Sequence, residues 1–284
     1  MRKVTAFCPT SLSFIFRSLF GSSIRQTGSI GIGCTLDKEV TVTVKSANKT
    51  NILFNGKPIH FPTVEYALSS IIDKSVAVNI KSPLPLGFGF GVSSASTLAA
   101  LFAVNKIFPL NMNKMQLAQI AHEAEIINHT GLGSVATQIT GGFLLKNKPG
   151  LPPSDFIKLP FAGKKLYAII IDKLETPSIL ENRNKLSLIN QTADKVLAAI
   201  QPKQITSLEK ALDIAYDFAV KSQLLTNQAV ADFIGKIRHE GGHATMAMLG
   251  QVVISNKKPN FNTHYRVEEL TITDKSVYII THSY

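Results

Sequence analysis

The stretch Pro83-Leu-Pro-Leu-Gly-Phe-Gly-Phe-Gly-Val-Ser-Ser-Ala95 gives the strongest indication of the fold. Three glycines alternate within it, immediately before a predicted helix over residues 93–107: Gly87, Gly89 and Gly91. Glycine allows a positive φ and a close approach of the backbone to a ligand. The free N–H groups of the helix, which Ser93 or Ser94 is expected to cap, would face this loop. Because these N–H groups and the helix dipole attract anions, the stretch predicts a site for a polyphosphate.

The spacing of the loop excludes two common nucleotide-binding motifs. No lysine follows Gly91 at the distance that a Walker A loop requires. The glycine pattern also departs from the G-x-G-x-x-G of dinucleotide-binding folds, and prolines interrupt the strand that should precede it. On spacing alone, a flexible glycine-rich loop without a ligand is the alternative.

The composition is that of a folded globular protein. The chain has 284 residues, of which 45% are apolar and 17% charged, enough for one large or two medium domains. Lysine and arginine number 30 against 19 acidic residues, so the formal net charge is +11. The positive residues are scattered and form no basic run interleaved with aromatic residues. We therefore expect a basic surface that attracts anionic metabolites, and no nucleic-acid partner.

The two cysteines, Cys8 and Cys34, are too few for a disulfide framework or a zinc cluster, which fits a reducing compartment. Cys8 lies in an apolar run and is expected to be a buried thiol. Pro9 and Arg17 interrupt any secretory apolar segment, and no stretch reaches the ~18 apolar residues of a membrane span. The sequence thus predicts a soluble cytoplasmic protein with no membrane partner.

Strands and helices mix in the first half of the chain. Alternating residues and a hairpin signal at Asn55-Gly56 predict four strands: residues 38–45, 51–54, 58–61 and 75–81. A helix is predicted over 63–73 with Thr63 as its N-cap. Another helix starts from Asn113, where Gln116 completes a capping box. This mixture indicates an α+β half.

The second half follows a stretch rich in Pro, Gly, Lys and Ser at residues 147–160. A buried strand is predicted at 166–171, and Thr206 and Glu209 are spaced as in a capping box. Periodic apolar residues predict three helices and then a tail of two strands: helices over 186–200, 206–215 and 227–236, and strands at 265–273 and 277–282. We therefore predict an α+β protein with domains at residues 1–155 and 156–284.

The glycine-rich stretch resembles the second motif of the GHMP kinases, Pro-x-x-x-Gly-x-Gly-Ser-Ser-Ala, with Val92 inserted before the serines. Further blocks keep the family's order and resemble archaeal pantoate kinases in particular. These blocks are Ala6-Phe-Cys-Pro9, His122 to Gln138, Gly141-Gly142, Pro149 to Pro153 and Ala244 to Gly250. The resemblance implies a two-domain GHMP-kinase-like α+β fold with the active site in the interdomain cleft. It also implies about five strands in the N-terminal half and a ferredoxin-like C-terminal half.

The resemblance implies that the loop binds the triphosphate of ATP. The residues at the corresponding positions are Pro85, Gly87, Gly89, Gly91, Ser93, Ser94 and Ala95. It also implies that a serine hydroxyl and a glutamate hold Mg²⁺, which we place on Ser94 and Glu125, with Glu123 as the alternative glutamate. One carboxylate suffices, because phosphates and water supply most ligands of Mg²⁺ in such sites. Without the motif, either glutamate would be an ordinary solvated charge.

The expected catalytic residues are Glu125 and Ser134. Ser134 stands where the sequence Gly-Leu-Gly is followed by aspartate in the relatives, and a serine is not a base at neutral pH. Either catalysis rests on the metal and on positioning, or the chain is slow or inactive. The residues expected to bind the substrate are Ser11, Gly28, Ser29, Thr137, Gln138 and His243.

A second departure is Ile30, where the family has an arginine in a Gly-Ser-Arg run. A basic contact for the substrate carboxylate is therefore missing at this position. The residues that could replace it are Arg17, Arg25 and His243. Met246, Met248 and Leu249 are expected to belong to the core rather than to a cofactor site.

The resemblance predicts an ATP-dependent kinase for the hydroxyl of a small hydroxy acid. The favoured reaction converts pantoate to 4-phosphopantoate on the archaeal route to coenzyme A. One alternative is a related kinase for homoserine or mevalonate. Another is a relative that binds nucleotide without catalysis. ATP and Mg²⁺ are the expected cofactors, and the sequence leaves a homodimer open.

Overall fold

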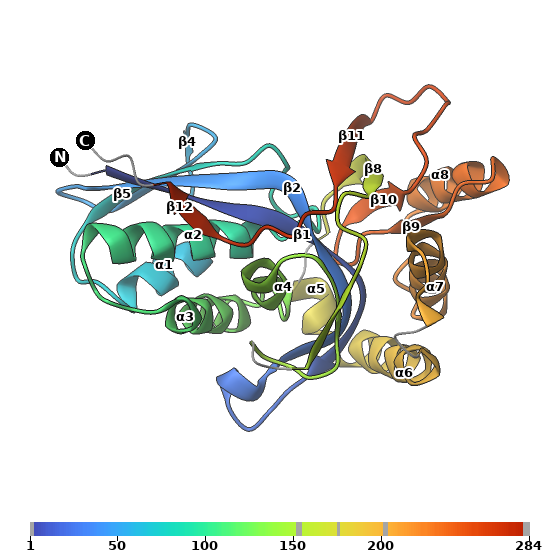
Figure 1. Ribbon diagram of the computed structural model, residues 1–284, viewed down its shortest axis with the longest axis horizontal. Coiled ribbons are helices and arrows are strands. Elements are labelled where there is room, and N and C mark those ends of the chain that lie inside the picture. Colours follow the sequence, from blue (N-terminus) through green and yellow to red (C-terminus); the bar gives the residue numbers. More distant parts are fainter. Residues whose placement is uncertain (1–2, 152–154, 175–176, 201–203, 281–284) are drawn as a thin grey trace.

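The computed structural model describes residues 3–151, 155–174, 177–200 and 204–280. It contains two β-sheets with helices packed against each, which confirms the predicted α+β class (Figure 1). The ends of the predicted strand at 277–282 and of the block from Pro149 to Pro153 lie outside the described residues. Within the described residues, no helix is both long and apolar enough to cross a membrane.

The larger sheet is built around one long hairpin. β1 (Lys3–Leu19) and β2 (Gly28–Ser46) pair antiparallel, and the connection between them carries the short helix η1 (Ile24–Gln26). Six shorter strands complete it: β3 (Asn51–Phe54), β4 (Lys57–Pro58), β5 (Val76–Lys81), β6 (Phe143–Lys146), β7 (Phe156–Leu159) and β12 (Tyr278–Ile280). The order is β12-β1-β2-β5-β3-β4, with β6 paired to β2 and β7 to β6. In the described residues this sheet has eight strands. Six of them, β1 to β6, lie within residues 1–155, for which the resemblance implied about five, and β7 and β12 come from the second half.

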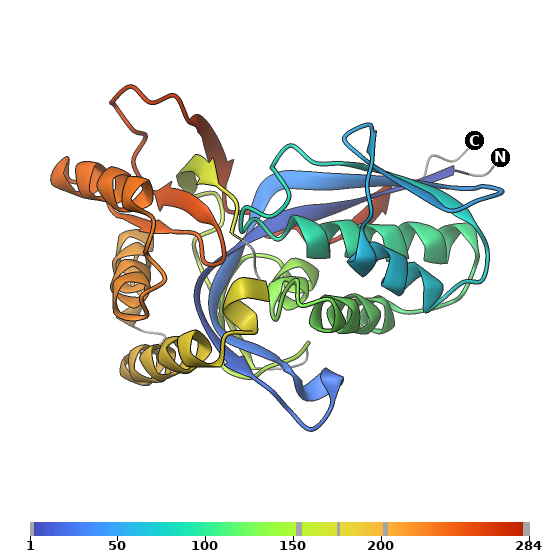
Figure 2. The same cartoon turned by 180° about the vertical axis from the view of Figure 1, so that it is seen from behind.

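Four helices lie over one face of the larger sheet (Figures 1 and 2). They are α1 (Pro62–Ser69), α2 (Val92–Ile107), α3 (Lys114–Ile127) and α4 (Ser134–Thr140). α2 packs on β1 and β2 and is covered in turn by α1 and α3, so it is buried on most sides. The predicted capping box of α3 is confirmed, because the Asn113 side chain accepts from the N–H groups of Met115 and Gln116. Packing of α2 places its N-terminus in the interior, beside the glycine-rich loop.

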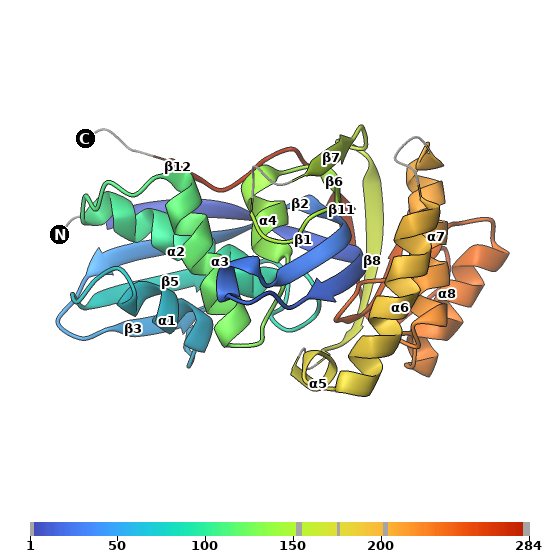
Figure 3. The ribbon, with the colours of Figure 1, turned by 90° about the horizontal axis from the view of Figure 1, so that it is seen from below.

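The smaller sheet lies beside the first and carries its own helices (Figure 3). Its strands are β8 (Lys165–Asp172), β9 (Ala244–Met246), β10 (Gln251–Ser255) and β11 (Arg266–Thr271). Four helices follow β8 in the chain: α5 (Pro177–Leu180), α6 (Arg183–Ala199), α7 (Leu208–Lys221) and α8 (Gln228–His239). The antiparallel order β11-β8-β10-β9 is that of a ferredoxin-like sheet, although residues 256–265 contain no helix. α7 and α8 pack on this sheet, and α6 packs on β1 of the other.

Two predicted helix caps are wrong by one or two residues. α1 begins at Pro62 with Phe61 as its N-cap, and Thr63 lies inside the helix. Proline suits this first position because its missing N–H would have no partner there. α7 is capped by Ser207 rather than Thr206. In both cases the sequence offers more than one residue at which the helix could begin, and the prediction selected the wrong one.

The chain passes between the sheets twice. β7 (Phe156–Leu159) still pairs with β6 in the larger sheet, and β8 begins the smaller one. After β11 the chain returns to the larger sheet, where β12 pairs with β1. The division into residues 1–155 and 156–284 stays a prediction. Cys8 and Cys34 are buried free thiols, as expected for Cys8.

Candidate active site

A cavity of about 340 Å³ is lined by both halves of the chain. The glycine-rich loop lines it between Leu86 and Ser93, and residues 128–134 line it from the end of α3 to the start of α4. Segments that flank strands of the smaller sheet contribute three lining residues: Leu174 after β8, and Met248 and Leu249 between β9 and β10. The cavity thus occupies a cleft between the two sheets, where the fold implies the active site.

All three glycines of the loop have a positive φ: 88° at Gly87, 81° at Gly89 and 60° at Gly91. Added side chains would also be too close to their neighbours at two of them. A Cβ at Gly91 would lie 2.3 Å from Ser11 Oγ, and a Cβ at Gly89 would lie 3.1 Å from Gly250 Cα. The loop therefore needs glycine for both its conformation and its packing.

The start of α2 differs from the prediction, because Gly91 is the N-cap and neither Ser93 nor Ser94 caps the helix. Ser94 is fully buried, and its Oγ donates to Gly91 O at 3.0 Å. Ser93 instead lines the cavity. Since no side chain caps this end of the helix, its N–H groups face the loop as an anion site requires.

Four of the seven residues expected to bind ATP line the cavity. They are Gly87, Gly89, Gly91 and Ser93. Pro85, Ser94 and Ala95 lie outside the lining, where Ala95 is buried with Ser94 in the first turn of α2.

Ser11 and Gln138 hold the loop from behind. The Ser11 N–H donates to Phe90 O at 2.9 Å. Gln138 Nε2 donates to Gly91 O at 2.8 Å and to Ser11 Oγ at 3.2 Å. Both side chains are buried and neither lines the cavity, so the structure brings them to the loop rather than to a substrate.

The smaller sheet holds the other end of the loop. The Leu174 N–H donates to Gly87 O at 3.2 Å. A Cβ at Gly250 would lie 2.2 Å from Phe88 O, so the turn between β9 and β10 packs directly on the loop. This turn ends the block Ala244 to Gly250, which resembled the family's third motif.

Glu125 is the buried carboxylate of the cavity, with 2% of its surface exposed. Its Oε1 accepts hydrogen bonds from Ser93 Oγ at 2.6 Å and Thr130 Oγ1 at 3.0 Å. Burial raises the pKa of Glu125 to about 7, against the effect of these two hydrogen bonds. A Cβ at Gly131 would lie 2.3 Å from Oε2, so glycine leaves room for that oxygen.

Glu123, the alternative to Glu125, lies on the outside of α3. Its Oε1 is 3.1 Å from Arg25 Nε and accepts from Gln119 Nε2 at 3.1 Å. It does not line the cavity. Of the two glutamates, only Glu125 shares a space with the glycine-rich loop.

Ser134 begins α4 and lines the cavity together with Ser29. Lys146 is not itself part of the lining but lies directly behind these residues, 5% exposed, and its Nζ donates to Gly133 O at 3.1 Å. A Cβ at Gly133 would lie 2.3 Å from Ser29 Oγ and 2.4 Å from Lys146 Nζ, so the hydroxyl and the ammonium converge on one point. Burial lowers the pKa of Lys146 to about 8. Among the described residues, no carboxylate forms an ion pair with this lysine.

Sequence reasoning did not select Lys146, nor its buried neighbour His122. His122 Nε2 donates to Thr27 O at 2.8 Å, and burial lowers the pKa of its ring. The charge of Lys146 lowers it further. The sequence did contain a signal for Lys146. It ends the apolar run Phe143-Leu-Leu-Lys146, and a strand this apolar is usually buried, so its lysine could have been predicted to be buried.

The basic residues expected to replace the missing contact at Ile30 do not line the cavity. Arg17 forms an ion pair with Asp194 on α6. Arg25 pairs with Glu123, as described above. Both guanidinium groups are therefore committed to carboxylates elsewhere.

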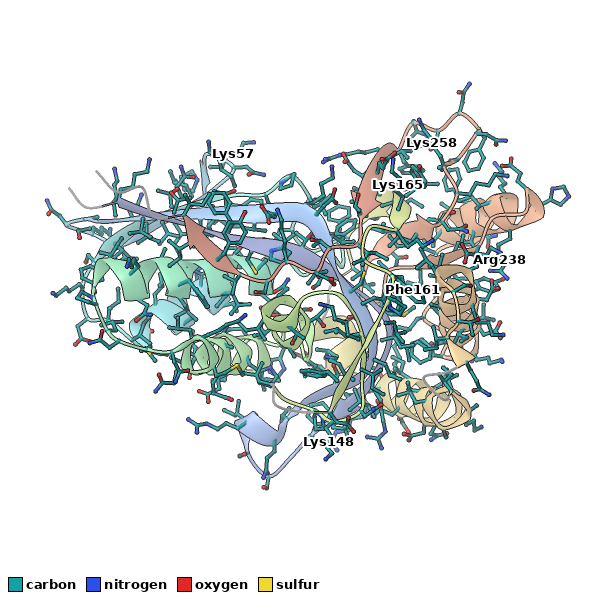
Figure 4. All side chains as sticks on the ribbon, viewed as in Figure 1. Lys57, Lys148, Phe161, Lys165, Arg238 and Lys258 are labelled. Carbon is teal, nitrogen blue, oxygen red and sulfur yellow. The ribbon has the colours of Figure 1, made fainter. Side chains whose placement is uncertain are left out.

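His243, the third basic candidate and an expected substrate residue, lies at the smaller sheet. Its Nδ1 is 2.9 Å from Asp213 Oδ2. Arg238, which Figure 4 labels near α8, donates to the other oxygen of Asp213 at 2.8 Å. None of these three residues lines the cavity, so the structure does not place His243 at the site.

Of the remaining residues expected at the substrate site or in the core, some line the cavity and others lie outside it. Thr137 Oγ1 donates within α4 to Gly133 O at 3.3 Å, and it does not line the cavity. Gly28 is buried against the backbone of Gly150, also outside it. Met246 and Met248 are buried core residues, as expected, whereas Leu249 is only partly buried and faces the cavity.

Known proteins resemble this chain both in its fold and in the sequence around the glycine-rich loop. Residues 61–142 match the family described as GHMP kinases N terminal domain, a segment that contains the loop, Glu125 and Ser134. The chain thus contains a segment of the GHMP-kinase N-terminal type, and its similarity to curated kinases over most of its length identifies it as an enzyme.

Two curated relatives that match most of the chain are pantoate kinases. A pantoate kinase of Methanospirillum hungatei is 27% identical, over 88% of this chain and 86% of that protein. A pantoate kinase of Methanocaldococcus jannaschii is 29% identical, over 89% and 92%. A solved structure described as a phosphotransferase related to the CoA biosynthesis pathway covers 98% of both chains, with a TM-score of 0.83 and 22% identity.

Proposed function

We propose that this enzyme transfers the γ-phosphoryl group of ATP to pantoate, giving ADP and 4-phosphopantoate. One observation carries the proposal. A single cavity combines a glycine-rich anion site beside Glu125 with a second polar corner, Ser29 backed by the buried Lys146. A polyphosphate and a small carboxylate could therefore bind together. The similarity to pantoate kinases supports the choice of acceptor.

The triphosphate is assigned to the glycine-rich loop and the start of α2. Gly87, Gly89 and Gly91 bring the backbone to the cavity, and α2 points its uncapped N-terminus there. Ser11 and Gln138 are positioning residues, because they bond the loop rather than the cavity. This arrangement offers charge stabilisation without an arginine or lysine in the loop itself.

Mg²⁺ fits beside Glu125 and Ser93. The carboxylate is buried, and the Ser93 hydroxyl is 2.6 Å from its Oε1. The described residues contain no cluster of three or more acidic, histidine or cysteine side chains that could hold a metal. One carboxylate and one hydroxyl suit Mg²⁺, which takes its other ligands from phosphates and water. When bound, the metal neutralises charge on the polyphosphate.

The metal-binding serine is therefore proposed as Ser93, in place of Ser94. The Ser94 hydroxyl is buried and already donates to Gly91 O. Because α2 begins at Val92, one residue earlier than predicted, Ser93 lies inside its first turn and its hydroxyl donates to Glu125.

The acceptor carboxylate is assigned to the corner formed by Ser29, Gly133 and Lys146. A buried ammonium that lacks a carboxylate is costly, and a bound substrate carboxylate would compensate it. Lys146 thus takes the part that the sequence suggested for Arg17, Arg25 or His243. Ser29 is the one expected substrate residue whose side chain lines the cavity.

In the proposed reaction the C4 hydroxyl oxygen of pantoate attacks the γ-phosphorus. The bond between that phosphorus and the β–γ bridging oxygen breaks, ADP leaves with this oxygen, and the hydroxyl proton passes to water. Ser134 lines the cavity but supplies no base at neutral pH. The chain acts through positioning and electrostatic stabilisation, which dominate phosphoryl transfer. Because both halves line the cavity, we also propose that residues 1–155 and 156–284 act as two domains around it.

The test is an assay of ADP release with ATP, Mg²⁺ and separate samples of pantoate, homoserine and mevalonate. Turnover with pantoate is expected. Lys146→Met should raise the KM for pantoate about 30-fold or more and leave the KM for ATP unchanged, since a buried charge pair is worth at least ~2 kcal/mol. Lys148→Met, at an exposed lysine that Figure 4 labels, is the matched control.

Other outcomes distinguish the alternatives. If only homoserine or only mevalonate is turned over, that compound is the acceptor and pantoate is not. ATP binding without turnover of any acceptor would contradict the proposed reaction. An unchanged KM for pantoate in Lys146→Met would move the carboxylate away from Lys146.

A further inference from the structure

The turn between β9 and β10 holds a leucine in an unusual backbone conformation. Leu249 has a φ of 63°, in the left-handed region that favours glycine and asparagine. The Gly250 N–H donates a hydrogen bond to the carbonyl oxygen of Ala247 at 3.3 Å. Leu249 is thus the third residue of a four-residue turn, and the glycine stands one position later. Residues in such conformations persist where their surroundings fix them, often at ligand sites.

Contacts on two sides fix this turn. The Met248 N–H donates to Ser13 O on β1 at 3.0 Å. On the other side, Gly250 is packed so tightly on the glycine-rich loop that a Cβ would lie 2.2 Å from Phe88 O. Leu249 stands in the chain between the two residues that make these contacts, and it lines the cavity. The turn therefore directs a leucine into the site, next to the loop assigned to phosphate.

The part of the cavity that the smaller sheet supplies is entirely apolar. Its lining residues are Leu174, Met248 and Leu249. Phe16 and Leu132 from the other half line the same cavity. An acceptor group beside the glycine-rich loop would thus meet hydrocarbon on this side, while its carboxylate meets the polar corner at Ser29.

We propose that the wall formed by Leu174, Met248 and Leu249 selects acceptors that carry a branched, fully substituted carbon next to the reacting alcohol. This inference rests on the proposed kinase function. Pantoate has two methyl groups on the carbon beside its primary alcohol. Homoserine has none, and mevalonate has its methyl group one carbon further away. Each methyl group in an apolar pocket is worth about tenfold in kcat/KM, so the pair is worth about 100-fold.

The experiment compares kcat/KM for pantoate and for 2,4-dihydroxybutanoate, the same acid without the two methyl groups. The enzyme should prefer pantoate by about 100-fold. Leu249→Asn should reduce this preference to below about tenfold, because it makes the wall polar. Asparagine tolerates the positive φ, so the turn is kept. The KM for ATP should not change. Val220→Asn, at an apolar residue that is 47% exposed on α7, is the control.

Three results would overturn the inference. Equal kcat/KM for both acids would remove the wall's role and leave the pantoate kinase function intact. Turnover of neither acid would remove the proposed function as well. A raised KM for ATP in Leu249→Asn, with the preference unchanged, would assign the wall to the nucleotide. If thermal unfolding reports that Leu249→Asn is unfolded, Leu174→Ala tests the same wall and should likewise reduce the preference.

Discussion

Replacing Glu125 by glutamine should stabilise the fold at alkaline pH in the absence of metal, although it removes activity. Glu125 is 2% exposed, and burial raises its pKa from 4.5 to about 7. A raised carboxyl pKa means that the native state holds the proton more tightly than the unfolded state. The stability from this group is therefore complete below about pH 4.5 and is lost as pH rises through about 7. Glutamine has a similar shape without the charge.

The magnitude follows from the size of the shift. A change from 4.5 to about 7, at about 1.4 kcal/mol for each unit, corresponds to roughly 3 kcal/mol at pH 8. Glutamine keeps an oxygen for Ser93 and Thr130 but places an amide group near Gly131, which costs about 1–2 kcal/mol. We therefore expect the variant to be about 1–2 kcal/mol more stable than the parent at pH 8, and no more stable at pH 5.

The assay is urea unfolding with EDTA between pH 5 and 8, beside ADP release with ATP and Mg²⁺. Glu125→Gln should lose activity by about 100-fold or more, because it removes the one carboxylate proposed for the metal. Glu123→Gln is the control. Its carboxylate forms an ion pair with the exposed Arg25, so stability should change by less than about 1 kcal/mol.

A specific result would refute this reasoning. Glu125→Gln could prove less stable than the parent at pH 8, with the same dependence on pH as the parent. The charge of Glu125 would then carry no burial penalty in the native state. The enzyme would not hold a destabilising carboxylate for its metal.

Further predictions concern the loop and the missing base. Gly91→Ala should abolish ATP binding in calorimetry, because a Cβ there would lie 2.3 Å from Ser11 Oγ at a φ of 60°; normal affinity would contradict the assigned loop geometry. Ser93→Ala should lower kcat about tenfold or more, and Ser94→Ala should mainly lower the Tm; equal losses of kcat would return the metal role to Ser94. Ser134→Asp should raise kcat by up to about 100-fold if a base limits the rate, and an unchanged kcat would assign catalysis to positioning alone.

The loop could be found from the sequence because its signals are local. Alternating glycines followed by a helix need no distant partner to be recognised, and Glu125 followed from the family pattern on the next helix. The choice between Ser93 and Ser94 could not be made in the same way. It depends on whether α2 begins at Val92 or one residue later, and one residue turns a helix by about 100°.

Lys146 required contacts that are distant in the sequence. It becomes buried because β6 pairs with β2, where Lys146 lies opposite Gly31. The same limitation explains His243, which the sequence placed at the substrate although it pairs with Asp213 at the smaller sheet. A pattern along the chain identifies candidate charges, but only the pairing of strands decides which of them come to lie beside a common cavity.

The return of β12 to the larger sheet covers part of β1 that would otherwise form a sheet edge. β12 pairs with β1 through Thr5, Ala6 and Phe7, and the Phe7 ring stacks on Tyr278 with centroids 5.2 Å apart. Without β12, the N–H and C=O groups along this part of β1 would form an open sheet edge, which can pair with another chain. A fragment of residues 1–155 would carry that edge and would be expected to self-associate. The last described strand therefore covers an edge of the half that contains the glycine-rich loop, and we expect that half to need the rest of the chain to stay monomeric.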